Sequence, residues 1–230
     1  MNAKRGYVPK DERNFSTAAI ETMKKASRHV CYLLDEGYDL KQVSTFVGNH
    51  FSLSERQRLA IVRSVASVGQ LQNRKEKEKT SIDGAEVWID GFNTVITLEV
   101  MFSGSLLFAC MDGTIRDLAA LRGSYKIIPE TELAVRTLLD TLAEMKVSSV
   151  HILLDEPVSN SGRLKTLIAE VGEGYPFDLD IQILKAVDST LWGKENVITS
   201  DSIILDHCIS WFNLIKPCTE KHGAKTFRVW

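Results

Sequence analysis

Four aspartates occupy equivalent positions in the 230-residue sequence, because each one closes a short apolar segment. The segments are VWID, HILLD, LKAVD and VITSD, and they end at Asp90, Asp155, Asp188 and Asp201. Four carboxylates at one edge of a sheet would repel one another, and a divalent cation would neutralise them. Oxygen ligands suit Mg²⁺ or Mn²⁺, which polarise phosphoryl oxygens and activate water. The pattern predicts a metal site at these four residues and phosphodiester hydrolysis as its chemistry.

A purely structural interpretation of the same aspartates also exists. Aspartate is common where a strand passes into a helix, since its carboxylate accepts hydrogen bonds from the first free amides. Asp155 or Asp201 could serve only as such a cap. The recurrence of one position in four segments is the observation that favours the metal site.

The second half of the chain alternates between strand and helix patterns. Apolar runs predict strands at residues 85–90, 148–155, 180–188 and 196–201, with an edge strand in the closing TFRVW. Helical spacing predicts helices at residues 129–145, 162–171 and 202–212. Such alternation is typical of a mostly parallel sheet flanked by helices on both faces. In such folds ligands bind beyond the carboxyl ends of the strands, where the four aspartates would lie.

The first 80 residues have a different pattern and charge. Apolar residues at three- and four-residue steps predict helices between Phe15 and Gly69, with an N-cap at Asp39 and a capping box from Ser52 to Glu55. Residues 1–80 carry a net charge of +6 and the remainder −8. We therefore predict a helical, basic domain over residues 1–80 and an α/β domain over residues 81–230. The charge run at residues 73–80 is predicted to be a linker or an exposed helix end.

A polar segment after Asp155 is the candidate substrate-binding region. Ser159, Asn160 and Ser161 lead into a predicted helix, whose free amides and partial positive charge suit a phosphate. Arg163 and Lys165 add cations, and Arg116, Arg122 and Lys126 are candidates to extend that rim. The segment lacks the GxxxxGK[ST] spacing of a nucleotide-binding P-loop. A Ser/Asn-capped helix with an exposed basic turn is the structural alternative.

Composition excludes several classes of protein. No apolar run approaches the length of a membrane span, and the opening MNAKRGYVPKDERN lacks the apolar stretch of a signal peptide. Four cysteines without a CxxC pair fit a reducing compartment. We expect a cytoplasmic protein without a membrane partner. The sequence does not fix the oligomeric state, so a homo-oligomer stays open.

Two motifs resemble a known class of nuclease domain. The segment VWIDGFNTVITLE is similar to the first-strand signature of PIN-like and NYN-type nucleases, and NVITSDSIILDH resembles their later strand. The resemblance implies a PIN-like fold in which Asp90 and Asp201 are metal ligands and Asn93 orients a metal-bound water or a phosphate. Those domains also carry an acidic residue in the middle of the chain, for which the candidates are Glu99, Asp112 and Asp117. For Asp112 a turn with Gly113 is the favoured interpretation.

Nearly the whole chain also resembles the prokaryotic domain of unknown function 434 family. The shared blocks are SGSLLFACMDGTIRDLAALRGSYK, DEPVSNSGRLK and ENVITSDSIILD. That family implies no activity. The leading hypothesis is therefore a Mg²⁺- or Mn²⁺-dependent ribonuclease with Asp90, Asn93, Asp155, Asp188 and Asp201 as its catalytic residues. The alternatives are a non-catalytic nucleic-acid or nucleotide-binding regulatory module, and hydrolysis of a small phosphate ester.

Overall fold

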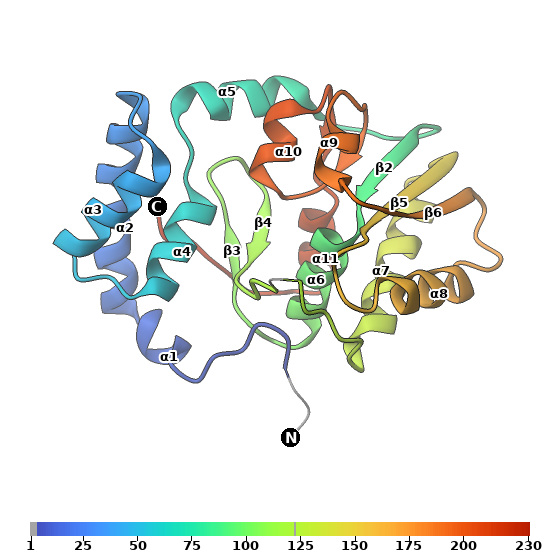
Figure 1. The fold of residues 1–230 in the computed structure, drawn as a ribbon, viewed down its shortest axis with the longest axis horizontal. Helices are drawn as coiled ribbons and strands as arrows, with labels where there is room; N and C mark the ends of the chain where they lie inside the picture. The colour runs from blue at the N-terminus through green and yellow to red at the C-terminus, as the bar shows by residue number, and fades with distance from the viewer. Residues whose placement is uncertain (1–3, 122) are drawn as a thin grey trace.

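A six-stranded parallel sheet forms the centre of the computed structural model, which describes residues 4–121 and 123–230. Its strand order is β1-β8-β7-β2-β5-β6, and each pairing is parallel (Figure 1). The strands are β1 (Glu78–Lys79), β2 (Glu86–Asp90), β5 (Ser149–Asp155), β6 (Asp178–Leu184), β7 (Val197–Ile198) and β8 (Trp211–Phe212). The prediction of a mostly parallel sheet flanked by helices is confirmed.

Helices cover both faces of this sheet because successive side chains of each strand point to opposite sides. In β2, Val87 and Ile89 pack with the larger apolar cluster, whereas Trp88 packs with a smaller one on the other face. The larger cluster includes side chains of α6 (Gly91–Phe102), α7 (Glu130–Glu144), α8 (Ser161–Val171) and α11 (Ile215–Lys221). The smaller one includes side chains of α9 (Val187–Leu191) and α10 (Ser202–His207).

The order of the strands creates a switch point at the centre of the sheet. From β2 the chain adds β5 and then β6 on one side, and it then crosses to add β7 and β8 on the other side. At such a point the connections leave the sheet in opposite directions, and doubly wound folds form their ligand-binding crevice beyond the carboxyl ends of the strands there. Asp90 ends β2, and Asp201 follows β7 by three residues. Both therefore lie at this crevice.

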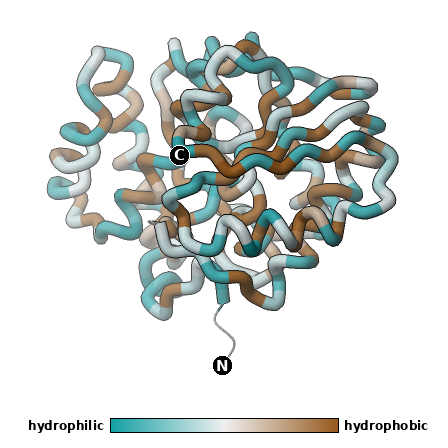
Figure 2. Tube along the Cα trace, turned by 45° about the vertical axis from the view of Figure 1, so that its right-hand side comes forward, coloured by the Kyte–Doolittle hydropathy of each residue, from teal (hydrophilic) through white to brown (hydrophobic). Residues whose placement is uncertain are grey.

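The N-terminal helices pack against a second, small sheet. They are α1 (Asp11–Asn14), α2 (Thr17–Asp35), α3 (Leu40–His50), α4 (Glu55–Ser64) and α5 (Val68–Lys77). The small sheet has the order β4-β3-β9 and consists of β3 (Leu107–Ala109), β4 (Ile115–Asp117) and β9 (Thr226–Phe227). Phe108, Leu118 and Val229 belong to the apolar cluster of the helices. Residues 1–80 thus share a core with later segments. Figure 2 shows the hydrophobic and hydrophilic stretches of the chain along these helices and strands.

The N-terminal predictions are confirmed in part. Asp39 caps α3 by accepting a hydrogen bond from the Gln42 amide at 3.0 Å. The capping box of α4 is formed by Ser54 and Gln57 instead of Ser52 and Glu55. Ser52 has a φ of 51°, so it belongs to the turn before the helix. Of the two interpretations of the charge run, the helix end is confirmed and the linker is wrong, because residues 73–77 end α5 and residues 78–79 form β1.

One helix and one strand are shorter than predicted. The helix expected over residues 202–212 ends at His207, and the following Trp211 enters β8 as a fully buried side chain. Its indole nitrogen donates to the Arg74 carbonyl at 2.7 Å, which fixes this segment as a strand beside β1. β6 ends at Leu184, so Asp188 lies in the first turn of α9 and not at a strand end. TFRVW does contain an edge strand, β9, but it belongs to the small sheet.

Within residues 4–121 and 123–230, none of the helices combines the length and the apolar character that crossing a bilayer requires.

The close approach of α6 to β5 depends on Gly91. A Cβ at this position would lie 2.6 Å from Leu154 Cδ2 and 2.8 Å from the Leu153 carbonyl oxygen. We expect Gly91→Ala to lower the free energy of unfolding by about 1–3 kcal/mol, because the backbone atom cannot move aside. Urea denaturation measures this change. Gly162→Ala is the control, since a Cβ at Gly162 meets nothing within 4 Å; equal effects of the two substitutions would contradict the packing argument.

Candidate active site

The four predicted aspartates lie at the crevice, but three different local structures position them. Asp90 ends β2 and caps α6 by accepting from the Asn93 amide at 3.3 Å. Asp155 ends β5. Asp188 lies in the first turn of α9, and Asp201 caps α10 by accepting from the Ile203 amide at 2.8 Å. The capping interpretation therefore holds for Asp90 and Asp201, whereas the side chain of Asp155 begins no helix.

The charges of these four carboxylates act on one another around a closed ring. Burial, followed by the charges of Asp201 and Asp155, raises the pKa of Asp90 to about 8. Burial and the charge of Asp188 raise the pKa of Asp155 above its ordinary value. Burial and the charge of Asp201 likewise raise the pKa of Asp188. Folding therefore gathers the four predicted residues into one electrostatic unit.

The ring has no cationic partner in the part of the chain that the structure describes. Among the described residues, none of the four aspartates takes part in an ion pair. Asp90 is only 6% exposed, and its second oxygen accepts from the Thr199 hydroxyl at 2.9 Å. A hydroxyl supplies one neutral hydrogen bond, which does not offset the repulsion between neighbouring carboxylates in a partly dehydrated site. The ring therefore lacks an ionic partner among the described residues, and the pKa of about 8 favours the protonated form of Asp90 at neutral pH.

The segment before Asp201 is fixed to β2 by a short polar network. The amide oxygen of Asn93 accepts from both the backbone amide and the hydroxyl of Ser200, each at 2.9 Å. The Thr199 hydroxyl accepts from the Asp201 amide at 3.0 Å while it donates to Asp90. Asn93 was predicted to face a water or phosphate, and its oxygen instead positions the turn that carries Asp201. The sequence analysis missed Thr199 and Ser200, although their place between β7 and Asp201 was a usable signal.

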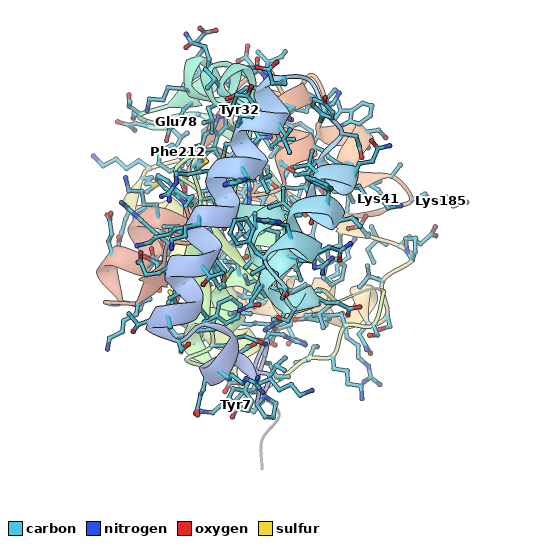
Figure 3. All side chains as sticks on the ribbon, turned by 90° about the vertical axis from the view of Figure 1, so that its left-hand side faces the viewer. Tyr7, Tyr32, Lys41, Glu78, Lys185 and Phe212 are labelled. Carbon is cyan, nitrogen blue, oxygen red and sulfur yellow. The ribbon has the colours of Figure 1, made fainter. Side chains whose placement is uncertain are left out.

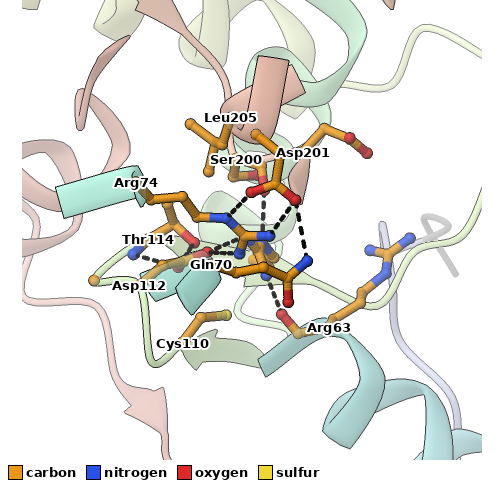
Figure 4. Close-up of polar contacts among 12 residues, drawn as sticks. Arg63, Gln70, Arg74, Cys110, Asp112, Thr114, Ser200, Asp201 and Leu205 are labelled. Carbon is orange, nitrogen blue, oxygen red and sulfur yellow. Dashed lines mark hydrogen bonds and ion pairs between the residues drawn. The ribbon is translucent and has the colours of Figure 1, made fainter. Parts of the chain in front are cut away.

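A buried network of charged side chains lies behind this turn (Figure 4). Arg116 donates to the Ser200 carbonyl at 2.5 Å and pairs with Asp112 at 2.5 Å. Arg74 of α5 pairs with Asp112 at 2.7 Å and with Asp206 of α10 at 2.6 Å. Arg116 is only 6% exposed, so it does not extend the cationic rim as predicted; Arg122 lies outside the described residues. The network joins the N-terminal helices to the helix that Asp201 caps.

The three candidates for a middle carboxylate are bound elsewhere. Glu99 is fully buried and accepts from Arg5 at 2.7 Å and from the Tyr125 hydroxyl at 2.6 Å. Asp117 accepts from the Thr97 hydroxyl at 2.8 Å and from the Ala119 amide at 2.7 Å. These contacts give Glu99 and Asp117 structural roles.

Asp112 forms the predicted turn with Gly113. Its carboxylate accepts from the Thr114 amide at 3.1 Å, and this turn joins the antiparallel strands β3 and β4. Although burial raises the pKa of Asp112, the charges of Arg116 and Arg74 and the hydrogen bond from Thr114 lower it below the ordinary value overall. The sequence thus predicted the turn, but the ion pairs at its tip come from residues far away along the chain.

The predicted substrate-binding segment follows β5 beside the ring. The Ser159 hydroxyl and the Asn160 amide group donate to the Tyr125 carbonyl at 2.9 and 2.6 Å, and the Ser161 hydroxyl donates to the Val158 carbonyl at 2.5 Å. These side chains therefore hold two loops together. No side chain caps α8, so its first amides stay available to a ligand. Arg163 is exposed in the first turn, whereas the charge of Lys165 acts on Asp180 in the edge strand β6.

The donor chemistry of the ring fits Mg²⁺ or Mn²⁺, with a limit on how many side chains one ion could use. In the part of the chain that the structure describes, no three His, Cys, Asp or Glu residues are close enough together to hold a metal ion. One ion would thus take one or two of the carboxylates and complete its shell with water and a phosphate. Mg²⁺ is commonly bound in this way.

Fold and site together define a doubly wound α/β protein with a carboxylate ring at its switch point. Residues 79–217 match the family model described as Domain of unknown function (DUF5616), and residues 22–77 match Protein of unknown function (DUF434). A Methanocaldococcus jannaschii protein described as uncharacterized is 34% identical over 186 residues, which cover 80% of this chain and 89% of that protein. The chain belongs to the DUF5616 family and carries the DUF434 region in front of it. No solved structure matches it.

The raised pKa of Asp90 makes stability depend on pH. Its folded-state pKa of about 8 exceeds the ordinary 3.8, so the folded state binds the proton more tightly and loses stability as pH rises between these values. We expect Asp90→Asn to remove this contribution, which makes the free energy of unfolding fall less steeply by up to about 1.4 kcal/mol per pH unit. Urea denaturation between pH 5 and pH 8, as an approximate working range, measures the slope. The exposed Asp178→Asn is the control; parallel curves for Asp90→Asn and the unaltered protein would contradict the assignment.

The buried Arg74 offers a second test. It is 2% exposed and pairs with both Asp112 and Asp206. We expect Arg74→Ala to lower the free energy of unfolding by about 3–5 kcal/mol, because it leaves Asp206 without its cation and Asp112 with Arg116 alone. Its neighbour Lys75 provides the matched control, since the Lys75 side chain is 80% exposed and pairs only with Glu78. Lys75→Ala should change stability by less than about 1 kcal/mol, as judged by chemical denaturation.

Proposed function

We propose that this protein is a metal-dependent ribonuclease whose second half is a PIN-like domain. The observation that carries the proposal is the ring of Asp90, Asp155, Asp188 and Asp201, in which neighbouring carboxylates influence one another and none has a cationic partner among residues 4–121 and 123–230. A divalent cation bound by one or two of these carboxylates would reduce their mutual repulsion. We take RNA as the substrate class because the DGFN and TSD motifs resemble those of nuclease domains.

The placement of the two motifs supports the PIN-like assignment. The DGFN segment starts α6 directly after β2, and the TSD segment joins β7 to α10 on the other side of the switch point. The order β6-β5-β2-β7-β8 is the 3-2-1-4-5 order of a doubly wound sheet, counted along the chain. Function inferred from a fold alone would be an analogy, so the carboxylate ring remains the stronger support.

Two carboxylates of the ring and the polar groups next to them have definable tasks in this proposal. A bound Mg²⁺ or Mn²⁺ would polarise the phosphoryl oxygen and lower the pKa of a water molecule. Asp90 and Asp201 would hold it, since both are fixed by hydrogen bonds at the switch point. Asn93 and Thr199 keep these two carboxylates in place. The uncapped first turn of α8, with Arg163, is placed to bind a neighbouring phosphate of the strand.

A non-catalytic regulatory module that binds nucleic acid or nucleotides is the second candidate. The ion pairs between α5, the β3–β4 turn and α10 connect the N-terminal helices to the crevice. That connection is the observation that favours a binding role, because a ligand that moves α10 on binding could then also move the N-terminal helices. The two candidates differ in whether metal produces cleavage.

The decisive measurement is cleavage of single-stranded RNA with Mg²⁺, with Mn²⁺ and with EDTA. We expect cleavage only with added metal, and we expect Asp90→Asn and Asp201→Asn each to lower its rate by at least about 100-fold, since even residues outside a metal's direct ligands change activity 10–100-fold. Asp178→Asn, at the opposite end of the sheet, should retain the rate. Nucleotides and sugar phosphates tested in parallel identify a small-ester phosphatase.

Metal-independent RNA binding without any cleavage would replace the nuclease by the regulatory module. Cleavage that survives both Asp90→Asn and Asp201→Asn would show that the activity belongs elsewhere.

A further inference from the structure

An exposed aromatic surface adjoins the carboxylate ring, on the short helices α9 and α10. Trp192, which follows α9, is 44% exposed, and its ring stacks on His207 of α10 with the ring centres 4.5 Å apart and the planes 20° apart. Ile203 and Ile209 beside them are 53% and 55% exposed. Large apolar side chains that gather at the surface mark a place of contact with a ligand or partner.

The stacked pair is held in place and leaves one ring face open. The Gly193 amide donates to the His207 carbonyl at 3.2 Å, and the His207 ring contacts the Ile203 carbonyl at 2.7 Å. The first contact joins the segment after α9 to the end of α10, and the second fixes the imidazole within α10. Since His207 covers one face of Trp192, the exposure of the indole indicates that its opposite face is accessible. A rigid ring pair of this kind extends a stack of planar groups without further rearrangement.

The chain connects this platform directly to the ring of carboxylates. Trp192 and Asp188 are one helical turn apart, and the Trp192 amide donates to the Asp188 carbonyl at 3.2 Å. The four-residue step between them corresponds to a rise of about 6 Å along a helix. His207 ends the helix that Asp201 caps. An extended strand with a phosphate at the carboxylates therefore has its neighbouring base within reach of the indole.

We propose that Trp192 and His207 form a platform on which an unpaired nucleobase of the substrate stacks. This inference rests on the proposed function and names the substrate as single-stranded RNA, because a base in a duplex has no free face to offer. Aromatic side chains bind single strands in this way without reading their sequence. Lys185, which precedes α9 and projects from the surface in Figure 3, is placed to contact the backbone of the same strand.

A nucleobase fits this surface better than a protein partner does. A stable protein interface buries about 1,200–2,000 Å², whereas the exposed apolar groups here are three side chains and one imidazole. A protein covering them would also close the crevice at Asp188 and Asp201. A flat ring ligand joined to a phosphate satisfies both the aromatic platform and the site next to it.

The test separates base stacking from cleavage by using an inactive background. Asp90→Asn with Asp201→Asn removes cleavage and two of the repelling charges. In this background, fluorescence anisotropy measures binding of a labelled single-stranded oligouridine and of an abasic ribose-phosphate oligomer of equal length. We expect Trp192→Ala to weaken oligouridine binding about tenfold, in line with the effect of losing one stacked base. Trp192→Phe should keep most of the affinity, because phenylalanine still presents a ring.

Two controls show whether the effect comes from stacking at this place. Phe46→Ala removes a 71% exposed ring from α3 and should leave binding unchanged. The abasic oligomer should bind weakly and equally to the background protein and to its Trp192→Ala variant. Equal affinity of oligouridine for these two proteins would overturn the proposal. So would a change of sedimentation on Trp192→Ala, because the surface would then be a contact between copies of the chain.

The outcome for the nuclease proposal is independent of this result. If the unaltered protein cleaves no RNA while Trp192→Ala weakens oligouridine binding, the nuclease proposal fails and the platform stands in a binding module. If cleavage depends on metal and on Asp90 while Trp192→Ala changes nothing, the nuclease stands and the platform fails.

Discussion

Electrostatic repulsion between four gathered carboxylates is the constraint on which the site depends. Asp90, Asp155, Asp188 and Asp201 are brought together by the two central strands of the sheet, by β5 and by the short helix α9. A protein does not keep such a ring unless packing elsewhere outweighs its cost. The apolar clusters on both faces of the sheet provide that packing, and burial together with the neighbouring charges raises the pKa values of Asp90, Asp155 and Asp188.

Buried ion pairs connect the N-terminal helices to the β3–β4 turn and to α10, next to the carboxylate ring. Arg74 and Arg116 neutralise Asp112 and Asp206, and Arg116 also holds the carbonyl of Ser200 next to Asp201. The charge run at residues 73–80, which was predicted to be a linker or an exposed helix end, thus includes the buried Arg74. Because the cations are used in this inner network, they do not reach the carboxylate ring itself. The buried arginines are paired with Asp112 and Asp206, whereas the four carboxylates of the ring have no such partner among the described residues.

The network of ion pairs connects the DUF434 region to the DUF5616 region. The DUF434 region supplies α5 with its buried arginine, and the DUF5616 region supplies the sheet and the ring. Phe108 of the second region and Val229, which follows it, complete the apolar core of the helices. The helices therefore do not close their core within residues 1–80, whereas the clusters on the faces of the large sheet consist of residues from 81–230.

Local sequence determined the elements whose signals are short-range. The alternating apolar runs located β2 and β5, the helical spacing located α7 and α8, and the Asp-Gly step located the turn at Asp112. Local signals also placed Asp90, Asp155 and Asp201 at the carboxyl edge of the sheet. Three-dimensional packing decided what those signals could not: that residues 211–212 form a strand, that Asp188 begins a helix, and which charges are paired. The reason is physical, because hydrogen-bond patterns within an element depend on neighbours in the chain, whereas burial and charge pairing depend on side chains that only folding brings into contact.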